Sequence, residues 1–250
     1  MRLTGSGFRT GDGTRCDPLT ITDAHSRYLL RCQIASHADT LHGAAIFDAA
    51  FGEYGLPLVI RTANGVPFAS RTPGGLSRLS MRWIQLGIVP QRTRPAAPQD
   101  HGRQERMHLT LQQATLHPPE RTARRQQQAF DRFPHESNHE RPPAALADAT
   151  PASCDTPSCR PLPRRIPELD YGDAIQVRRI AQQGRLKWNG QRTFGSEIFA
   201  SQRLGLRALD ERYCEVLYGP LTVGFFDTDR HLFHRALSLG LRRRLGMEQR

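Results

Sequence analysis

The chain reads LVIRTANGVPF over residues 58–68, GLSRLSMRWIQLGIVP over 75–90 and RPAAPQDHGRQERMHLTL over 94–111. The first segment opens with an apolar run that predicts a short strand over 58–60, ending at a polar Asn64-Gly65 turn. Apolar residues at helical spacing predict a helix over 76–86, followed by a strand at 88–89 and a second helix that carries Glu105. This order, with carboxylates expected at strand ends, indicates a metal-dependent phosphotransferase core.

Two motifs in this stretch resemble the catalytic core of bacterial insertion-sequence transposases, the branch related to retroviral integrases. TANGVPF at 62–68 stands where that family has Ser-Asp-Asn-Gly-x-x-Phe, and PQDHGRQERMHLTL at 98–111 follows its Pro-Gln-x-x-Gly-x-x-Glu-Arg-x-His-x-x-Leu pattern. NHERPPAAL at 138–146 resembles a further family segment, with Pro143 in place of the usual His. The resemblance covers nearly the whole chain. It implies an α/β fold, an RNase H-like mixed sheet flanked by helices, and an Asp-Asp-Glu metal site.

The composition limits the classes of protein to consider. The chain has 250 residues, which suffice for one medium domain and a small one. Its 35 basic and 24 acidic residues give a net charge of +11, which suits a polyanionic partner because Lys and Arg release counterions from phosphates. A well-solvated basic surface would give the same charge, so the charge alone does not establish nucleic-acid binding.

Cysteine usage and hydropathy indicate a cytoplasmic protein. Five cysteines are scattered along the chain without a C-x-x-C pair, and no signal peptide is visible. All five are therefore expected to be reduced. No apolar run approaches the roughly 20 residues that span a bilayer, so a soluble protein without a membrane partner is expected.

The remaining segments complete the predicted order of elements. Residues 1–35 predict a three-strand meander with a turn at Gly11-Asp12-Gly13. Asp39 or Thr40 is expected to cap a helix with an apolar face over 41–54, which Gly55 and Pro57 end. A helix over 100–117 and a Gln/Arg-rich helical segment follow. From residue 171, five short strands with an Asn189-Gly190 hairpin turn predict a small SH3-like β-barrel, which many of these transposases carry after the core.

These patterns predict four parts. They are an RNase H-like core over 1–133, a Pro-rich linker over 134–170, a β-barrel over 171–230 and a basic tail over 231–250 that either continues as a helix or frays.

The resemblance implies two-metal chemistry that this sequence supports only in part. The family uses Mg²⁺, or Mn²⁺, held by carboxylates. Glu105 matches the family Glu; taken alone it indicates a solvated helix carboxylate paired with Arg103 or Arg106, and the flanking pattern favours the metal ligand instead. Ala63 occupies the position of the second Asp, and a methyl group cannot coordinate a metal. Metal binding is therefore expected to be impaired.

The first family Asp also has no counterpart. Counting back from Phe8 places Leu3 at its position, so the chain is expected to begin partway into the first strand. Asp23 is a candidate substitute because a hairpin turn near Asp12 would place it opposite that strand. In the family, however, this Asp-x-x-Ser-Arg segment is structural. The helix-turn-helix region that precedes the family's core is also missing, which predicts loss of sequence-specific recognition.

Basic residues near the expected site and in the barrel are candidate DNA contacts. They are Arg61, Arg92, Arg94, Arg103 and Arg106 near the core, and Lys187 with Trp188 in a basic part of the barrel. For each one the alternative is an ordinary solvated surface residue, or for Trp188 a core residue.

The sequence thus predicts a DNA-transposition protein that is catalytically inactive and retains DNA binding, as a homo-oligomer or in a mixed complex. Two alternatives remain open: a DNA-binding or multimerisation module that interferes with an intact transposase, and an unselected remnant that folds poorly.

Overall fold

The computed structural model describes residues 8–35, 40–62, 68–93, 102–143 and 146–247. Contacts within the chain divide it into two compact units. The first unit comprises residues 1–68 with 88–164, and the second comprises 69–87 with 165–250. The expectations on Leu3, Ala63, the Asn64-Gly65 turn and Arg94 lie outside the described residues.

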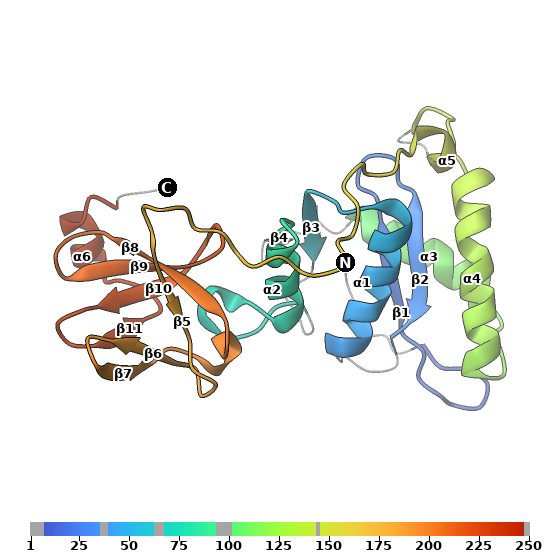
Figure 1. Ribbon diagram of the computed structural model, residues 1–250. Coiled ribbons are helices and arrows are strands. Elements are labelled where there is room, and N and C mark those ends of the chain that lie inside the picture. The colour runs from blue at the N-terminus through green and yellow to red at the C-terminus, as the bar shows by residue number, and fades with distance from the viewer. Residues whose placement is uncertain (1–7, 36–39, 63–67, 94–101, 144–145, 248–250) are drawn as a thin grey trace. The chain divides into compact units, whose positions relative to one another are not determined.

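The first unit combines two small sheets with helices (Figure 1). Its elements are β1 (Pro18–Thr22), β2 (Leu29–Ile34), α1 (Thr40–Tyr54), β3 (Val59–Thr62), β4 (Val89–Arg92), α3 (Gly102–Thr115), α4 (Ala123–His139) and α5 (Pro151–Cys154). β1 pairs with β2 antiparallel, and β3 pairs with β4 parallel, with Val59 opposite Val89. Two of the three predicted meander strands are described, together with a single bridge between Arg9 and Arg15.

Helices cover both faces of the β1–β2 hairpin. On one face, Leu29 and Cys32 pack against Leu111 of α3 and against Phe130 and Phe133 of α4. On the other face, the Arg31 guanidinium donates hydrogen bonds to the Ala49 carbonyl and the Glu53 carboxylate of α1. Leu29 and Arg31 reach different layers although they are two residues apart, because the pairing of β1 with β2 shifts register between Ile21 and Thr22, opposite these residues.

Two amide side chains of α4 form hydrogen bonds with backbone groups along the edge of β2 that does not pair with β1. The Asn138 side chain accepts from the Leu29 N–H at 2.8 Å and donates to the Leu29 carbonyl at 3.1 Å. Gln127 likewise accepts from the Ile34 N–H and donates to the Cys32 carbonyl. An edge strand offers unpaired backbone groups to other chains, so these amides take the place of a neighbouring strand.

The second unit is built on an antiparallel sheet of order β11-β10-β9-β8-β5. Its strands are β5 (Gln176–Arg179), β6 (Arg185–Trp188), β7 (Gln191–Phe194), β8 (Arg203–Ala208), β9 (Tyr213–Tyr218), β10 (Leu221–Asp227) and β11 (Leu232–His234). β6 and β7 form a separate hairpin. The helices are α2 (Arg78–Gln85) and α6 (Leu239–Arg244), with short 3₁₀ turns η1 (Pro73–Gly75) and η4 (Glu197–Phe199).

Helix α2 belongs to this second unit, although the sequence placed it between two strands of the core. A capping box between Ser77 and Ser80 begins the helix. Met81 and Ile84 then pack into the core of the sheet with residues such as Val216 and Phe226. An amphipathic pattern shows that a helix buries one face, but it does not identify the core that receives that face.

The predicted division of the chain differs from the structure in two further places. Helix α4 continues to His139, six residues past the predicted end of the core at 133, with Pro134 inside the helix. The tail expected over 231–250 contributes β11 to the sheet before it forms α6. In total, the described part of the second unit holds seven strands where the sequence predicted five.

Two glycines shape the second unit as the sequence requires. The predicted hairpin turn lies between β6 and β7, with φ of 43° at Asn189 and 82° at Gly190, which a two-residue type I′ turn needs. At Gly205 in β8, an added Cβ would lie 2.5 Å from the Tyr171 ring. The Tyr171 hydroxyl donates to the Arg203 carbonyl and accepts from the Gly219 N–H, so the ring is held close to the backbone at Gly205, where a side chain would collide with it.

No helix within the described ranges is long and apolar enough to cross a membrane.

Candidate nucleic-acid interface

The described residues do not provide the metal site that the family resemblance implies. Glu105 lies in the first turn of α3 and is exposed to solvent. In the part of the chain that the structure describes, no group of three or more His, Cys, Asp or Glu side chains is arranged to hold a metal. A pair of divalent ions needs more negative charge than one glutamate supplies. The residues described therefore do not fit a two-metal centre.

Asp23, the candidate substitute, closes the turn between β1 and β2. Its Oδ1 accepts hydrogen bonds from the backbone N–H groups of His25 and Ser26 and from the Ser26 hydroxyl. Burial raises the pKa of Asp23, but these hydrogen bonds outweigh burial and leave the pKa below its usual value. The Ser26 hydroxyl also lies 2.7 Å from Asp155, which ties the turn to the segment after α5. This arrangement gives Asp23 a structural role.

His108, three residues after Glu105, anchors α3 to β1. Its Nε2 lies 2.9 Å from the Thr20 hydroxyl, and the residue is only 3% exposed. Burial lowers the pKa of His108 to about 4, so the imidazole is neutral near pH 7. The sequence motif contained this histidine but did not reveal the contact, because Thr20 is 88 residues away.

The basic residues predicted in the first unit fall on two elements. Arg61 of β3 and Arg92 of β4 lie on paired strands, one register position apart, and Arg61 donates to the Gln91 side chain at 3.4 Å. Arg106 follows Glu105 on α3 and is exposed. For Arg103, only the helical backbone is described. The structure thus places Arg61 and Arg92 on neighbouring strands but on opposite faces of the pair, and the described residues give no single surface for these cations.

The β6–β7 hairpin carries the most concentrated positive charge of the predicted sites. Lys187 pairs directly with Arg192 across the hairpin, and Arg185 lies two residues before Lys187 on the same face. All three are exposed. None forms a hydrogen bond or ion pair with any residue that the structure describes. Like charges directly opposite one another in a sheet are destabilising, so this face is suited to a polyanion.

Trp188, the aromatic residue predicted beside Lys187, faces the opposite way. Its ring packs edge-on against Phe226 with centroids 5.5 Å apart, and the residue is half-buried at the edge of the core. The Arg178 guanidinium lies 5.4 Å from the centre of the Trp188 ring. A cation at this distance is attracted by the ring, so Trp188 fixes Arg178 of β5 next to the hairpin.

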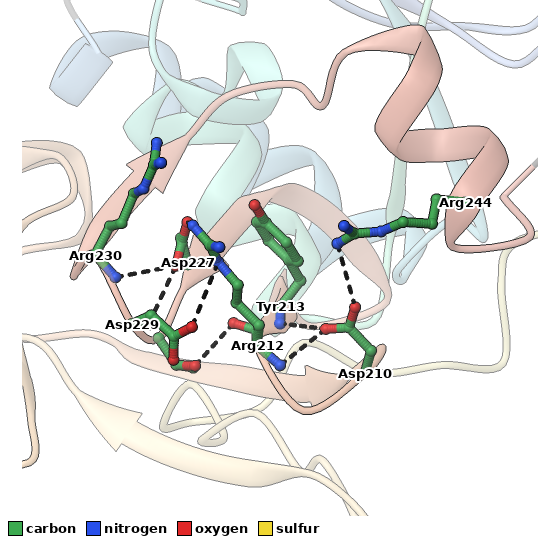
Figure 2. A network of polar contacts seen from close by, with 8 residues as sticks. Asp210, Arg212, Tyr213, Asp227, Asp229, Arg230 and Arg244 are labelled. Atoms are coloured by element: carbon green, nitrogen blue, oxygen red, sulfur yellow. Dashed lines mark hydrogen bonds and ion pairs between the residues drawn. The ribbon is translucent and has the colours of Figure 1, made fainter.

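An ion pair between the partly exposed Arg212 and the buried Asp227 joins β9 to β10 at one end of the sheet (Figure 2). The Arg212 guanidinium donates two hydrogen bonds to the Asp227 carboxylate, at 3.0 and 2.6 Å, and Asp227 is only 1% exposed. Asp227 also accepts from the N–H groups of Asp229 and Arg230 in the β10–β11 turn. The hydrogen bonds from Arg212, followed by those from the turn, lower the pKa of Asp227 to about 2.

Helix α6 packs beside this ion pair. Arg244 and Arg212 both lie against the Tyr213 ring, at 5.8 and 5.2 Å from its centre, and Arg244 also pairs with Asp210 at 3.7 Å (Figure 2). Apolar side chains of α6 and its flanks, including Leu241, pack against Tyr213 and Phe225. The three consecutive arginines 242–244 therefore extend from a docked helix.

Comparison with solved structures identifies the architecture. The chain is similar to a chain in the cryo-EM structure of the simian T-cell lymphotropic virus intasome in complex with PP2A regulatory subunit B56 gamma, with a TM-score of 0.50. The match covers 94% of this chain and 77% of the other, at 16% sequence identity. The fold is integrase-like. At this identity the likeness shows the fold and leaves the activity open. No protein-family model matches the chain.

Proposed function

We propose that this integrase-like protein acts in DNA transposition or integration as a DNA-binding chain that no longer performs phosphoryl transfer. The intasome likeness favours the DNA-integration class. The transposase motifs favour an RNase H-like first unit, an SH3-like second unit and, more specifically, the insertion-sequence branch. Ala63 at the second Asp position argues against activity.

The Lys187–Arg192 pair carries the proposal. Two exposed cations held opposite each other repel, and no described carboxylate relieves the repulsion. A phosphate backbone relieves it and gains counterion release in addition. Because contacts from Lys and Arg to phosphates carry no sequence information, binding is expected to be largely independent of DNA sequence.

Binding to a labelled 30-base-pair duplex tests this role. The double variant Lys187→Gln/Arg192→Gln should lower the affinity about 10-fold near 0.1 M salt, and the slope of log K against log salt should fall in magnitude by about 2. The matched control is Arg203→Gln/Arg207→Gln, which removes two cations of the same unit that already pair with Glu168 and Glu215.

The control should bind within about 2-fold of the unaltered chain. An equal loss of affinity in both double variants would show that only the overall charge matters, and would contradict the assignment of the hairpin. Binding to one duplex sequence far above others would contradict the expected lack of sequence preference.

A further inference from the structure

The last two turns of α4 carry a pair of histidines that no role described so far uses. His135 and His139 lie four residues apart, so they project from the same face of the helix. Their ring centroids are 4.9 Å apart with the ring planes tilted by 33°. Both side chains are exposed, and both line a surface groove of about 280 Å³ together with Asp131.

The surroundings of the pair favour free imidazole lone pairs. Nδ1 of His135 lies 3.7 Å from the Glu140 carboxylate, which is beyond hydrogen-bonding distance, so no described hydrogen bond occupies this imidazole. His139 makes no hydrogen bond or ion pair with any described residue, so its ring is available to turn toward His135.

We propose that His135 and His139 form a two-histidine site for a divalent transition-metal ion such as Zn²⁺. Imidazole nitrogen suits Zn²⁺, Cu²⁺ and Ni²⁺, whereas Mg²⁺ prefers oxygen ligands. Water completes the coordination at the open side of the groove. The site lies outside the Asp-Asp-Glu positions and is independent of DNA binding by the hairpin.

The geometry distinguishes this site from that of a zinc hydrolase. Residues 135–139, HESNH, match the H-E-x-x-H pattern of metalloproteases. A catalytic zinc also needs a third protein ligand and a shielded cavity, whereas the His135 side chain is 74% exposed. Glu136, which would be the general base, pairs with Arg141 at 3.5 Å. The site therefore binds a metal without hydrolytic machinery.

Metal binding here would stabilise the contact between α4 and β2. Asn138 lies between the two histidines in sequence, and its amide bonds both backbone groups of Leu29. An ion held by residues 135 and 139 fixes the helical turn that presents Asn138. Because the Leu29 N–H donates to Asn138, its exchange with solvent should slow when the metal binds.

Titration of the untagged full-length chain with Zn²⁺ tests the site. A Cys159→Ser background removes the exposed thiol as a competing ligand. Calorimetry at pH 7.5 should show one zinc per chain at this site. His135→Gln and His139→Gln should each weaken binding at least 10-fold, because each removes one of the two imidazole ligands. The matched control is His25→Gln, which alters an exposed histidine in the β1–β2 turn.

Hydrogen exchange at Leu29 gives a second readout. Zn²⁺ should slow it in the Cys159→Ser chain and in the His25→Gln control, and should leave it unchanged in the His139→Gln variant, while Mg²⁺ should have no effect in any of them. Equal zinc affinity in the control and in both pair variants would overturn the proposal, as would exchange at Leu29 that does not respond to bound zinc. Unchanged urea midpoints of the metal-free variants would confirm that the substitutions leave the fold intact.

Discussion

His108 illustrates how one buried side chain couples stability to pH. The folded chain keeps its imidazole neutral beside Thr20, and burial holds the pKa near 4. An unfolded chain has a histidine pKa of about 6.5, so it takes up the proton first as the pH falls. The contribution of His108 is therefore fully present above about pH 6.5 and declines toward pH 4.

The variant His108→Gln should remove this part of the pH dependence. Between pH 7 and pH 4.5 the unaltered chain should lose on the order of 2–3 kcal/mol more stability than the variant, because glutamine does not titrate. Urea unfolding at the two pH values measures the difference. His25→Gln, which changes an exposed histidine, should behave like the unaltered chain. The same loss in all three proteins would show that His108 is not the group responsible.

Asp227 shows how the fold compensates a buried negative charge with a hydrogen-bonded cation. Its carboxylate is buried, and both oxygens accept hydrogen bonds from the same guanidinium of Arg212. A buried charge is costly unless it is paired and hydrogen-bonded in this way. The two partners are 15 residues apart and join the start of β9 to the end of β10, so the pair fixes the register there.

At the scale of elements, the seam between α4 and β2 depends on amide side chains. Asn138→Leu should leave the N–H and C=O of the buried Leu29 without their partner, which costs about 1–3 kcal/mol for each unsatisfied group. Urea unfolding should therefore show a loss of about 3 kcal/mol, and hydrogen exchange at Leu29 should accelerate.

The neighbouring Ser137→Ala is the matched control for this seam. Ser137 is half-buried on the same helix and forms no hydrogen bond with a described residue. It should cost less than about 0.5 kcal/mol. If Asn138→Leu is as mild as this control, the amide does not hold the edge of β2.

At the scale of the whole molecule, the missing carboxylates predict that the chain does not cut DNA. Supercoiled plasmid incubated with the protein in Mg²⁺ or Mn²⁺ should remain intact, at the same level as with Glu105→Gln. A single glutamate does not compensate the charge of two divalent ions. Nicking that disappears in Glu105→Gln would show that the site still holds metal and would contradict the inactive state.

Sequence patterns predicted the local elements well. The helix ending at Gly55, the hairpin turn at Asn189-Gly190 and the helix around Glu105 are all present, because caps and turns are set by neighbouring residues. Of the two barrel residues proposed to contact DNA, Lys187 faces outward as expected, but Trp188 faces the core. Strand spacing predicts this alternation, but not which face is buried until the partner elements are known.

The sequence by itself determined the basic charge, the Ala at position 63 and several local elements, since each depends on residue identity or on neighbours in the chain. Only the tertiary structure decided that α2 packs with the C-terminal sheet, that His108 reaches Thr20, that Asn138 completes the edge of β2, and that Lys187 faces Arg192. Apart from the Lys187–Arg192 pair, which depends on hairpin register, these contacts join residues far apart in sequence. Several residues could satisfy each such contact equally well, so local patterns do not specify which of them meet.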